Sequence, residues 1–501
     1  MYLQLLFNIQ CVELAEKVIK NKNSNSNSNP IKKELQLRGN PILPPPVVSK
    51  PIVETEIVKQ IQIQTPPNRI KSIPTPIVSN AKPNPIPTST VDGNSFQIDS
   101  IGTALLIICS SHRPDYLQRT LSFVLKYHPR IGFPVILSED GSSPQVKAII
   151  DTFRKEIQKQ PVDMDGHGRI IRSKLYIPPS DTVESAVEGK VVPVIHLHHP
   201  KSNERAENGY FKLSKHFKYA LGVVFDHPTH ESYSSYQSIP SPYLSGQMLI
   251  SPSGFQRVVI LEEDIQISPD FFEFFSSVTH MVDNDESILC ASAWNDNGFA
   301  NLINPTLDRF KLVRSDFFPG LGWMFTKKLW IDELSAKWPR AYWDDWLREP
   351  PQRKNRHTIR PEICRTYHFG TKGVSGGQYN SYLNDIALNE EFQPFTALNL
   401  DYLKENAWNN DKYMDKVKKS EIVTKQNFLK ERDSILMKNS HESLRIVYTS
   451  LDGREPTSFV SLAKWSKCMD NIKANVPRTA YKGVVSIWKE GVKLHLTPNL
   501  L

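Results

Sequence analysis

Between residues 103 and 293, short apolar runs alternate with stretches in which apolar residues recur at helical spacing. The apolar runs lie at Thr103–Cys109, Phe133–Leu137, Val191–Leu197, Arg257–Leu261 and Ser287–Ala293. Each run is short and continuous, which is typical of a strand buried on both faces. Between the runs, the spacing predicts helices that begin near Pro114, Ser143, Leu213 and Ser268. This alternation predicts an α/β fold with a mainly parallel sheet and helices on both of its faces.

The pattern changes on either side of this region. Residues 1–100 are rich in Asn and Ser and then in Pro, which predicts a low-complexity stalk without a packed core. We predict a main domain over residues 101–377, with polar insertions near 160–190 and 226–253. The polar stretch 378–443 reads as a linker. Short β-like pieces around a helical stretch predict a small α+β domain over residues 444–501.

Composition narrows the possible classes of protein. The chain has 501 residues, of which 39% are hydrophobic, so it can bury a sizeable core. Its net charge of +8 comes without a long basic run, and we therefore expect no nucleic-acid partner. The five cysteines are widely spaced and form no CxxC motif, which excludes cysteine zinc clusters and thioredoxin-like chemistry.

The first 20 residues match neither a membrane span nor a signal peptide. Polar residues such as Gln4, Gln10 and Glu13 interrupt their apolar pieces. A span needs about 20 mostly apolar residues, and a signal peptide needs a basic start before an apolar stretch. Taken alone, this start predicts a cytosolic protein.

An acidic triplet follows the predicted strand Arg257–Leu261. Glu262, Glu263 and Asp264 stand at the end of a buried strand, where parallel α/β sheets bind their ligands. Three neighbouring carboxylates repel one another, and a divalent cation would remove that repulsion. Their hard oxygen atoms suit Mg²⁺ or Mn²⁺. The alternative is that these acids only mark the exit of a strand into solvent.

Aromatic and polar residues are interleaved farther along the chain. They occupy the strings SAWNDNG (292–298), DFFPGLGW (316–323) and KWPRAYWDDW (337–346). Aromatic ring faces pack on sugar C–H surfaces while polar groups hydrogen-bond hydroxyls, so these strings favour sugar recognition. At least half of the aromatic residues are expected in the core. The paired acids of the WDDW string are harder to place there, because buried carboxylates need partners.

Together these strings resemble the inverting β-1,2-N-acetylglucosaminyltransferases, the N-acetylglucosaminyltransferase I family. The resemblance rests on EED followed by SPDFF, on SAWNDNG, DFFPGLGW, KWPRAYWDDW, IRPE and FGTKGVSGG, and on VPRTAYKGVVS and VKLHLTP. It covers about Ala104 to Pro498 without the two insertions. It implies a GT-A-type nucleotide-sugar-binding domain that uses UDP-GlcNAc and Mn²⁺, and a high-mannose N-glycan acceptor on glycoproteins.

The resemblance also implies roles for particular residues. Asp264 would be the direct protein ligand to the metal, and Asp344 would be the catalytic base. Residues that would contact the donor or acceptor are Arg113, Asp140, His216, Glu262, Glu263, Trp343 and Ser375. Glu263 stands where the family has Asp. The family's disulfide partner of Cys290 corresponds to Thr358, with Cys364 nearby, so the pairing of Cys290 stays open at this point.

The reaction that the resemblance implies agrees with these residue types. A carboxylate takes the proton of the attacking mannose hydroxyl, a cation stabilises the departing UDP, and one direct displacement inverts the anomeric configuration. We expect transfer to the α-1,3-mannose arm of N-glycans, the step that starts hybrid and complex N-glycans. The alternatives are transfer to protein O-linked mannose, a glycan-binding homologue without catalysis and a nucleotide-sugar hydrolase.

The resemblance changes the interpretation of the N-terminus. The family works in the Golgi lumen on an N-terminal signal-anchor and a stalk. The stretch from Asn21 to about Ser100 fits the stalk, whereas the residues before it do not fit the anchor. We therefore expect a Golgi membrane protein with a luminal catalytic domain, whose true start lies upstream of Met1 or whose present form lacks the anchor.

Overall fold

The computed structural model describes most of the chain from Gly102 onwards. The described residues are 102–130, 132–159, 192, 194–199, 208–226, 255–371, 380–383, 385–405, 412–438 and 442–499. The predicted stalk, both insertions apart from Asp226, and Ser375 lie outside them. Within the described residues, no helix is both long enough and apolar enough to span a bilayer.

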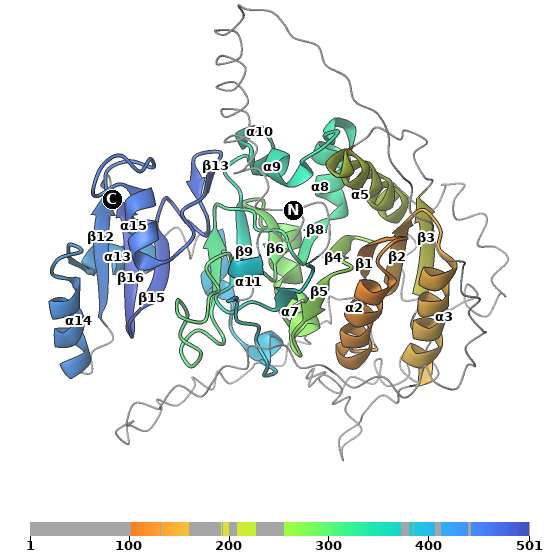
Figure 1. Cartoon of the computed structure of the whole chain (residues 1–501), viewed down its shortest axis with the longest axis horizontal. Coiled ribbons are helices and arrows are strands. Elements are labelled where there is room, and N and C mark those ends of the chain that lie inside the picture. The colour runs from red at the N-terminus through yellow and green to blue at the C-terminus, as the bar shows by residue number, and fades with distance from the viewer. Residues whose placement is uncertain are drawn as a thin grey trace, which may run out of the picture. The chain divides into compact units, whose positions relative to one another are not determined.

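An eight-stranded sheet forms the centre of the fold (Figure 1). In spatial order its strands are β3 (Val194–His199), β2 (Val135–Asp140), β1 (Thr103–Ser110), β4 (Arg257–Glu262), β8 (Trp323–Thr326), β6 (Ile288–Ser292), β9 (His357–Pro361) and β7 (Leu312–Ser315). The first four strands are parallel to one another. The predicted α/β class with a mainly parallel sheet is therefore confirmed.

Apolar side chains bury this sheet on both faces. Alternate residues of β1, β2 and β4 share one core with α2 (Pro114–Tyr127), α3 (Pro144–Lys159) and α7 (Phe271–Asn284). The intervening residues Leu106 and Ile108 are also buried, on the opposite face. Burial on both faces is the reason why β1 reads as one continuous apolar run. Figure 1 shows α2 and α3 side by side along the parallel half of the sheet.

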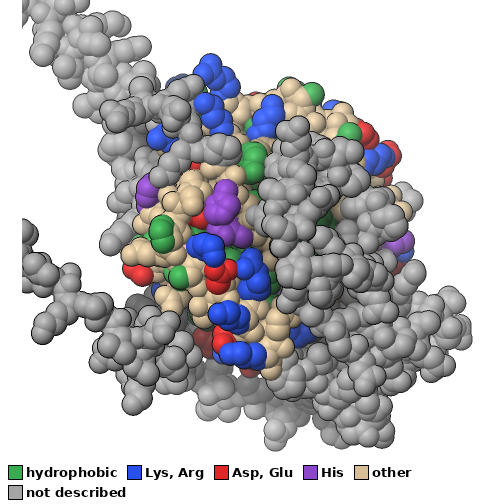
Figure 2. All heavy atoms as spheres, turned by 90° about the vertical axis from the view of Figure 1, so that its right-hand side faces the viewer, with side chains coloured by type: hydrophobic (Ala, Val, Ile, Leu, Met, Phe, Trp, Pro, Cys, Tyr) green, Lys and Arg blue, Asp and Glu red, His purple; other side chains and the backbone are tan. Residues whose placement is uncertain are grey.

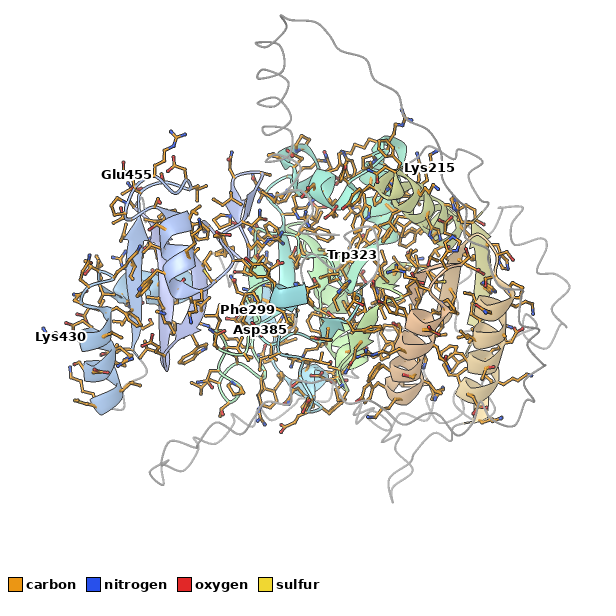
Figure 3. All side chains as sticks on the ribbon, in the orientation of Figure 1. Lys215, Phe299, Trp323, Asp385, Lys430 and Glu455 are labelled. Atoms are coloured by element: carbon orange, nitrogen blue, oxygen red, sulfur yellow. The ribbon has the colours of Figure 1, made fainter. Side chains whose placement is uncertain are left out.

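Strand β8 departs from the predicted alternation. It lies between β4 and β6 and runs antiparallel to both of them. Its first residue is the last residue of the Gly-rich string DFFPGLGW, which we interpreted as sugar-binding. Trp323, labelled in Figure 3, thus begins a central strand, and its side chain is buried.

A second, four-stranded sheet lies near the C-terminus. Its strands in spatial order are β11 (Glu421–Ile422), β12 (Ser443–Tyr448), β16 (Val492–Pro498) and β15 (Val485–Lys489). The helices of this region are α13 (Lys412–Lys419), α14 (Phe428–Met437) and α15 (Phe459–Ser466). The β-like pieces and the helix predicted after residue 444 are present. Strand β11 and two of these helices come from the stretch that we predicted as a linker.

Buried polar side chains join this C-terminal region to the large sheet. Asp296 pairs with Nη1 of Arg478 at 2.8 Å. The side-chain amide of Asn297 donates a hydrogen bond to Oγ1 of Thr479 at 2.9 Å. Its Oδ1 accepts a hydrogen bond from the backbone N–H of Met469 at 2.8 Å. These polar residues of the SAWNDNG string therefore bond within the protein. Our interpretation that they meet a sugar is wrong for their side chains.

The cysteines of the described residues are all free. Cys109, Cys290, Cys364 and Cys468 are buried thiols. Cys290 lies opposite Thr358 on the parallel strands β6 and β9, with 3.4 Å between Sγ and Oγ1. Cys364 instead accepts a hydrogen bond from the Asn295 amide at 3.1 Å. Cys290 and Cys364 do not pair, and a contact between Cys290 and Thr358 stands where the resemblance implied a disulfide.

Thr358→Cys should restore this disulfide. Neighbouring strands lie about 4.8 Å apart, close to the separation at which two cysteines can be bridged. Compared with its reduced form, we expect the oxidised variant to have two fewer titratable thiols and a free energy of unfolding higher by about 2–4 kcal/mol. Thiol titration and urea unfolding measure both changes. The double variant Cys290→Ser/Thr358→Cys is the control, and equal stabilisation of this control would contradict the pairing.

Candidate active site

The ends of the parallel strands bring the predicted site residues to one edge of the large sheet. Ser110 at the end of β1 lies opposite Asp140 at the end of β2, and Asp140 lies opposite His199 at the end of β3. On the other side of β1, Ile108 pairs with Glu262 at the end of β4. The parallel register therefore gathers charged groups that are far apart in the sequence.

The acidic triplet directly follows β4, and Arg113 contacts two of its members. Nη2 of Arg113 lies 2.6 Å from Oε1 of Glu263, and Nη1 lies 3.0 Å from Oδ2 of Asp264. The other oxygen of Glu263 accepts a hydrogen bond from the Ser110 amide at 2.8 Å. Arg113 immediately precedes α2, so the turn between β1 and α2 fixes the position of its guanidinium.

A two-stranded sheet brings a further residue to Asp264. Strand β5 (Ile265–Ile267) pairs with β10 (Thr366–His368), which places His368 opposite Ile265. Nε2 of His368 lies 3.5 Å from Oδ2 of Asp264, and the next amide, that of Phe369, donates to the Asp264 carbonyl at 3.0 Å. A Cβ atom at Gly370 would lie 2.5 Å from Oδ2 of Asp264. Only glycine fits there without displacing the carboxylate.

Burial and charge act in opposite directions on the acidic triplet. Burial raises the pKa of Glu263 to about 7 even though Arg113 opposes that shift. Burial and the charge of Asp264 also raise the pKa of Glu262. Burial would do the same to Asp264, but His368 and Arg113 hold its pKa well below the usual range. The most firmly ionised carboxylate of the triplet is therefore Asp264, the residue predicted to bind the metal.

Asp140 belongs to a second group at the same edge. Its Oδ1 lies 3.0 Å from Nδ1 of His199. Burial acts to raise the pKa of Asp140, but this hydrogen bond and the charges of His216, His199 and Lys212 together lower it. The ring of His199 stacks on that of His216 with 5.1 Å between centroids. His216, on α5 (Gly209–Asp226), approaches Oγ of Ser138 with Nε2 at 2.9 Å. Burial and His199 lower the pKa of His216 to about 3, so its ring is neutral at pH 7.

Asp344 lies in the first turn of α9 (Trp343–Arg348) and is buried. Its Oδ2 is 3.2 Å from Nη1 of Arg348, which also pairs with Asp345. The Nε of Arg348 donates to the Phe318 carbonyl at 3.0 Å. Asp345 in turn pairs with Lys473 from the C-terminal region at 3.1 Å. The guanidinium of Arg348 thus fixes the orientation of the Asp344 carboxylate.

Trp343 packs inside an aromatic stack. Its ring lies 4.5 Å from that of Phe217 on α5, 5.6 Å from Trp323 on β8 and 5.9 Å from Trp338, measured between centroids. Its exposed fraction is 3%. A sugar could reach this ring only after its neighbours moved. The contact of Trp343 with a sugar stays a prediction. The packing of its ring joins α5, β8 and α9.

The structure brings together part of the predicted set. Arg113, Glu263 and Asp264 are in direct contact, and Glu262 lies beside them. Asp140 and His216 form the neighbouring group, joined through His199. Asp344 belongs to a different element, α9, and Ser375 lies outside the described residues. The arrangement can hold a cation on carboxylate oxygens beside a fixed guanidinium.

Sequence reasoning missed the residues that hold these groups in place. They are His368 and Gly370 beside Asp264, His199 beside Asp140, and Arg348 and Lys473 beside the acids of α9. A signal existed for the first two, because Gly370 lies in the FGTKGVSGG string and His368 directly precedes that string. Arg348 also has a local signal, because it lies four residues after Asp344 on the same helix. His199 and Lys473 carry none, since only tertiary contacts bring them to Asp140 and Asp345.

Comparisons with known proteins add independent findings. Residues 226–501 match the GNT-I family. An Arabidopsis thaliana protein named alpha-1,3-mannosyl-glycoprotein 2-beta-N-acetylglucosaminyltransferase is 34% identical over 388 residues, which cover 76% of this chain and 70% of that protein.

Solved structures show only distant likenesses. One is S. aureus TarS, residues 1–349, with a TM-score of 0.30 and 10% identity over 53% of this chain and 60% of that chain. Another is the mannosyltransferase PcManGT from Pyrobaculum calidifontis in complex with GDP-Man and Mn²⁺, with a TM-score of 0.23 and 10% identity over 46% of each chain.

His216→Gln should change how stability depends on pH. Folding lowers the pKa of the His216 ring from 6.5 to about 3. Between these two pH values the ring is protonated in the unfolded state and neutral in the folded state. Below pH 6.5 this proton uptake on unfolding should lower the free energy of unfolding of the unsubstituted protein, relative to the variant, by about 1.4 kcal/mol per pH unit. Urea unfolding at pH 7, 6 and 5 measures the difference. His280→Gln, at an exposed histidine, should follow the unsubstituted profile, and parallel profiles for all three proteins would refute the prediction.

Proposed function

This chain belongs to the GNT-I family, and from that membership we propose that it transfers N-acetylglucosamine from UDP-GlcNAc in β-1,2 linkage to the α-1,3-mannose arm of N-glycans. The family makes the chain a glycosyltransferase. The observation that carries the proposal is the contact of Arg113 with Glu263 and Asp264 at the end of β4, where an α/β sheet binds its ligand.

The acidic triplet fits a divalent cation. Asp264 is buried and firmly ionised. Because residue 370 is glycine, its backbone lies close to Oδ2 of Asp264 without a side chain that would displace the carboxylate. Its oxygen donors are those that Mn²⁺ and Mg²⁺ prefer. In this proposal Asp264 is the direct ligand, and Glu262 and Glu263 face the donor sugar and ribose. When bound, the ion would supply positive charge against the diphosphate leaving group.

The protein's own residues would perform the remaining steps. Arg113 is fixed by two carboxylates and offers its guanidinium at the phosphate side of the site. Asp140 and the neutral His216 present hydrogen-bonding groups for the nucleotide. Asp344, oriented by Arg348, would accept the proton of the mannose hydroxyl as that oxygen attacks the anomeric carbon. A single displacement then inverts the α-linked donor to a β-linked product.

The proposed setting follows from the same family. The acceptor would be a high-mannose N-glycan on a glycoprotein, and the place of action would be the Golgi lumen, with membrane attachment through an N-terminal anchor. Ser375 and Trp343 remain proposed substrate contacts, the former outside the described residues and the latter inside the aromatic stack.

An acceptor assay tests the proposed function. The purified chain is incubated with UDP-GlcNAc, Mn²⁺ and either a five-mannose N-glycan or an O-mannosyl peptide. We expect product from the N-glycan and a kcat about 10²–10⁴-fold lower for Asp344→Asn, because a proton acceptor in the transition state is lost. Product from the peptide alone would show that the acceptor is protein O-linked mannose and not the N-glycan. An equal loss for the neighbouring Asp345→Asn would contradict the assignment of the base to Asp344.

The metal assignment is tested by Gly370→Ala and Asp264→Asn. The added Cβ at position 370 would push the Asp264 carboxylate aside, and a misplacement of about 1 Å costs roughly 10²-fold in rate. We expect that loss in kcat/KM for Gly370→Ala and no Mn²⁺-dependent turnover for Asp264→Asn. Gly453→Ala, whose Cβ would lie 3.4 Å from Val460, serves as the control. Full activity of Asp264→Asn would refute the assignment.

A further inference from the structure

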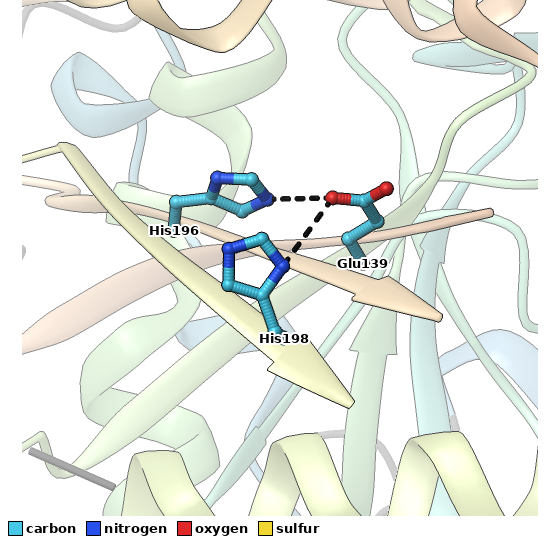
Figure 4. Close-up of side chains that lie close together, drawn as sticks. All are labelled: Glu139, His196 and His198. Atoms are coloured by element: carbon cyan, nitrogen blue, oxygen red, sulfur yellow. Dashed lines mark hydrogen bonds and ion pairs between the residues drawn. The ribbon is translucent and has the colours of Figure 1, made fainter. Parts of the chain in front are cut away.

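A cluster of two histidines and one glutamate lies on the edge of the large sheet that β3 forms. Glu139 is on β2, and His196 and His198 are on β3, the outermost of the described strands of this sheet. Nε2 of His196 is 3.0 Å and Nδ1 of His198 is 3.5 Å from the same Oε2 of Glu139 (Figure 4). The three potential ligand atoms all lie within 4.8 Å of one another.

This cluster faces away from the candidate active site. Successive residues of a strand point to opposite faces of the sheet. Ser138 and Asp140 point towards His216 and His199, so Glu139 between them points to the other face. His196 and His198 share that face because they are two residues apart and both contact Glu139. The cluster is therefore separate from the groups that we assign to UDP-GlcNAc.

The carboxylate of Glu139 is left incompletely paired. Its side chain is fully buried. Among the described residues, its Oε1 has no hydrogen-bond partner, and its Oε2 contacts only imidazole nitrogens. A buried carboxylate is costly without compensating charge and hydrogen bonds. A bound cation would supply that charge.

We propose that Glu139, His196 and His198 bind a divalent transition-metal ion, with Zn²⁺ as the best match. Two imidazoles and one carboxylate are typical zinc ligands, whereas Mg²⁺ and Mn²⁺ favour sites made of oxygen atoms. Bond lengths of about 2.0–2.1 Å at tetrahedral angles place neighbouring ligand atoms about 3.3 Å apart. The two separations from Oε2 of Glu139, 3.0 Å to His196 and 3.5 Å to His198, bracket that value.

The site has a route for the ion to enter. The side chain of His198 is 45% exposed, whereas that of His196 is 8% exposed. Figure 2 views the side on which β3 and α3 lie in Figure 1, and histidine side chains reach the surface there beside acidic and basic ones. Nδ1 of His198 now approaches the Gly141 carbonyl at 3.3 Å. Coordination replaces that long hydrogen bond and leaves a fourth position for water.

The ion would tie β3 to β2. An outermost strand has one hydrogen-bonded neighbour, and β3 depends on its ladder with β2. Two ligands on β3 and one on β2 would cross-link this pair. Because only the folded protein holds these three ligands together, Zn²⁺ should raise the melting temperature.

Zinc binding to tag-free protein tests the proposal. The full chain is stripped with a chelator and dialysed against buffered Zn²⁺, and bound zinc is counted by mass spectrometry. We expect one tight equivalent in the unsubstituted protein and in Asp264→Asn, because the latter alters the other candidate site. His198→Ala should bind zinc at least about tenfold more weakly. His198→Asp, which restores a ligand, should recover part of that loss.

Thermal unfolding gives a readout that does not depend on catalysis. Zn²⁺ should raise the melting temperature of the unsubstituted protein, of Asp264→Asn and of His280→Ala, but not that of His198→Ala. His198 is half-exposed, so its replacement leaves the fold intact, which the metal-free melting temperature checks. The proposal is overturned if the unsubstituted protein binds no zinc equivalent, or if His198→Ala binds zinc as tightly as the unsubstituted protein.

Discussion

The parallel pairing of β1 with both β2 and β4 is the constraint on which the site depends. It fixes Ser110, Asp140 and Glu262 at one edge of the sheet, although they are distant in the sequence. The amide of Ser110, at the end of β1, then reaches the carboxylate of Glu263, so the backbone of one strand orients the acidic group of its neighbour. A shift of this register by one residue would turn each of these side chains to the opposite face.

Acids gathered in this way need positive partners, and the fold supplies them from rigid positions. Arg113 comes from the start of α2, and His368 comes from β10. Strand β10 is itself held by Arg365, whose fully buried guanidinium pairs with Asp270 at the start of α7 at 3.1 Å. A buried ion pair of this kind contributes little net stability, but breaking it is costly. Its effect here is to fix the strand that carries His368 to Asp264.

The sequence was informative where a signal is local and long. Continuous apolar runs such as Thr103–Cys109 predicted the parallel strands. The acids after Arg257–Leu261 predicted the edge of the sheet at which the candidate site lies. Strand β8 was missed because four residues after a Gly-rich turn carry too little periodicity to be distinguished from a loop. From the interleaved aromatic and polar residues we predicted sugar contacts for Asn295–Asn297, but their side chains make buried contacts within the protein. The same residue types occur at sugar-binding surfaces and at buried polar contacts, so composition alone does not distinguish the two. His368 and His199, the partners of Asp264 and Asp140, could not be predicted, because each comes from an element that only tertiary folding brings near. Arg348 lies four residues after Asp344 on the same helix, so helical spacing is a signal for that pair.

The ion pair between Asp296 and Arg478 has a consequence for how the protein is made. Its two members are 182 residues apart in the chain. A ribosome therefore releases the large sheet, with the carboxylate of Asp296, well before the guanidinium that neutralises it. A buried carboxylate without its partner destabilises a fold by about 3–5 kcal/mol. Until Arg478 has been synthesised, the large sheet therefore lacks the partner of this buried carboxylate, which the C-terminal region supplies.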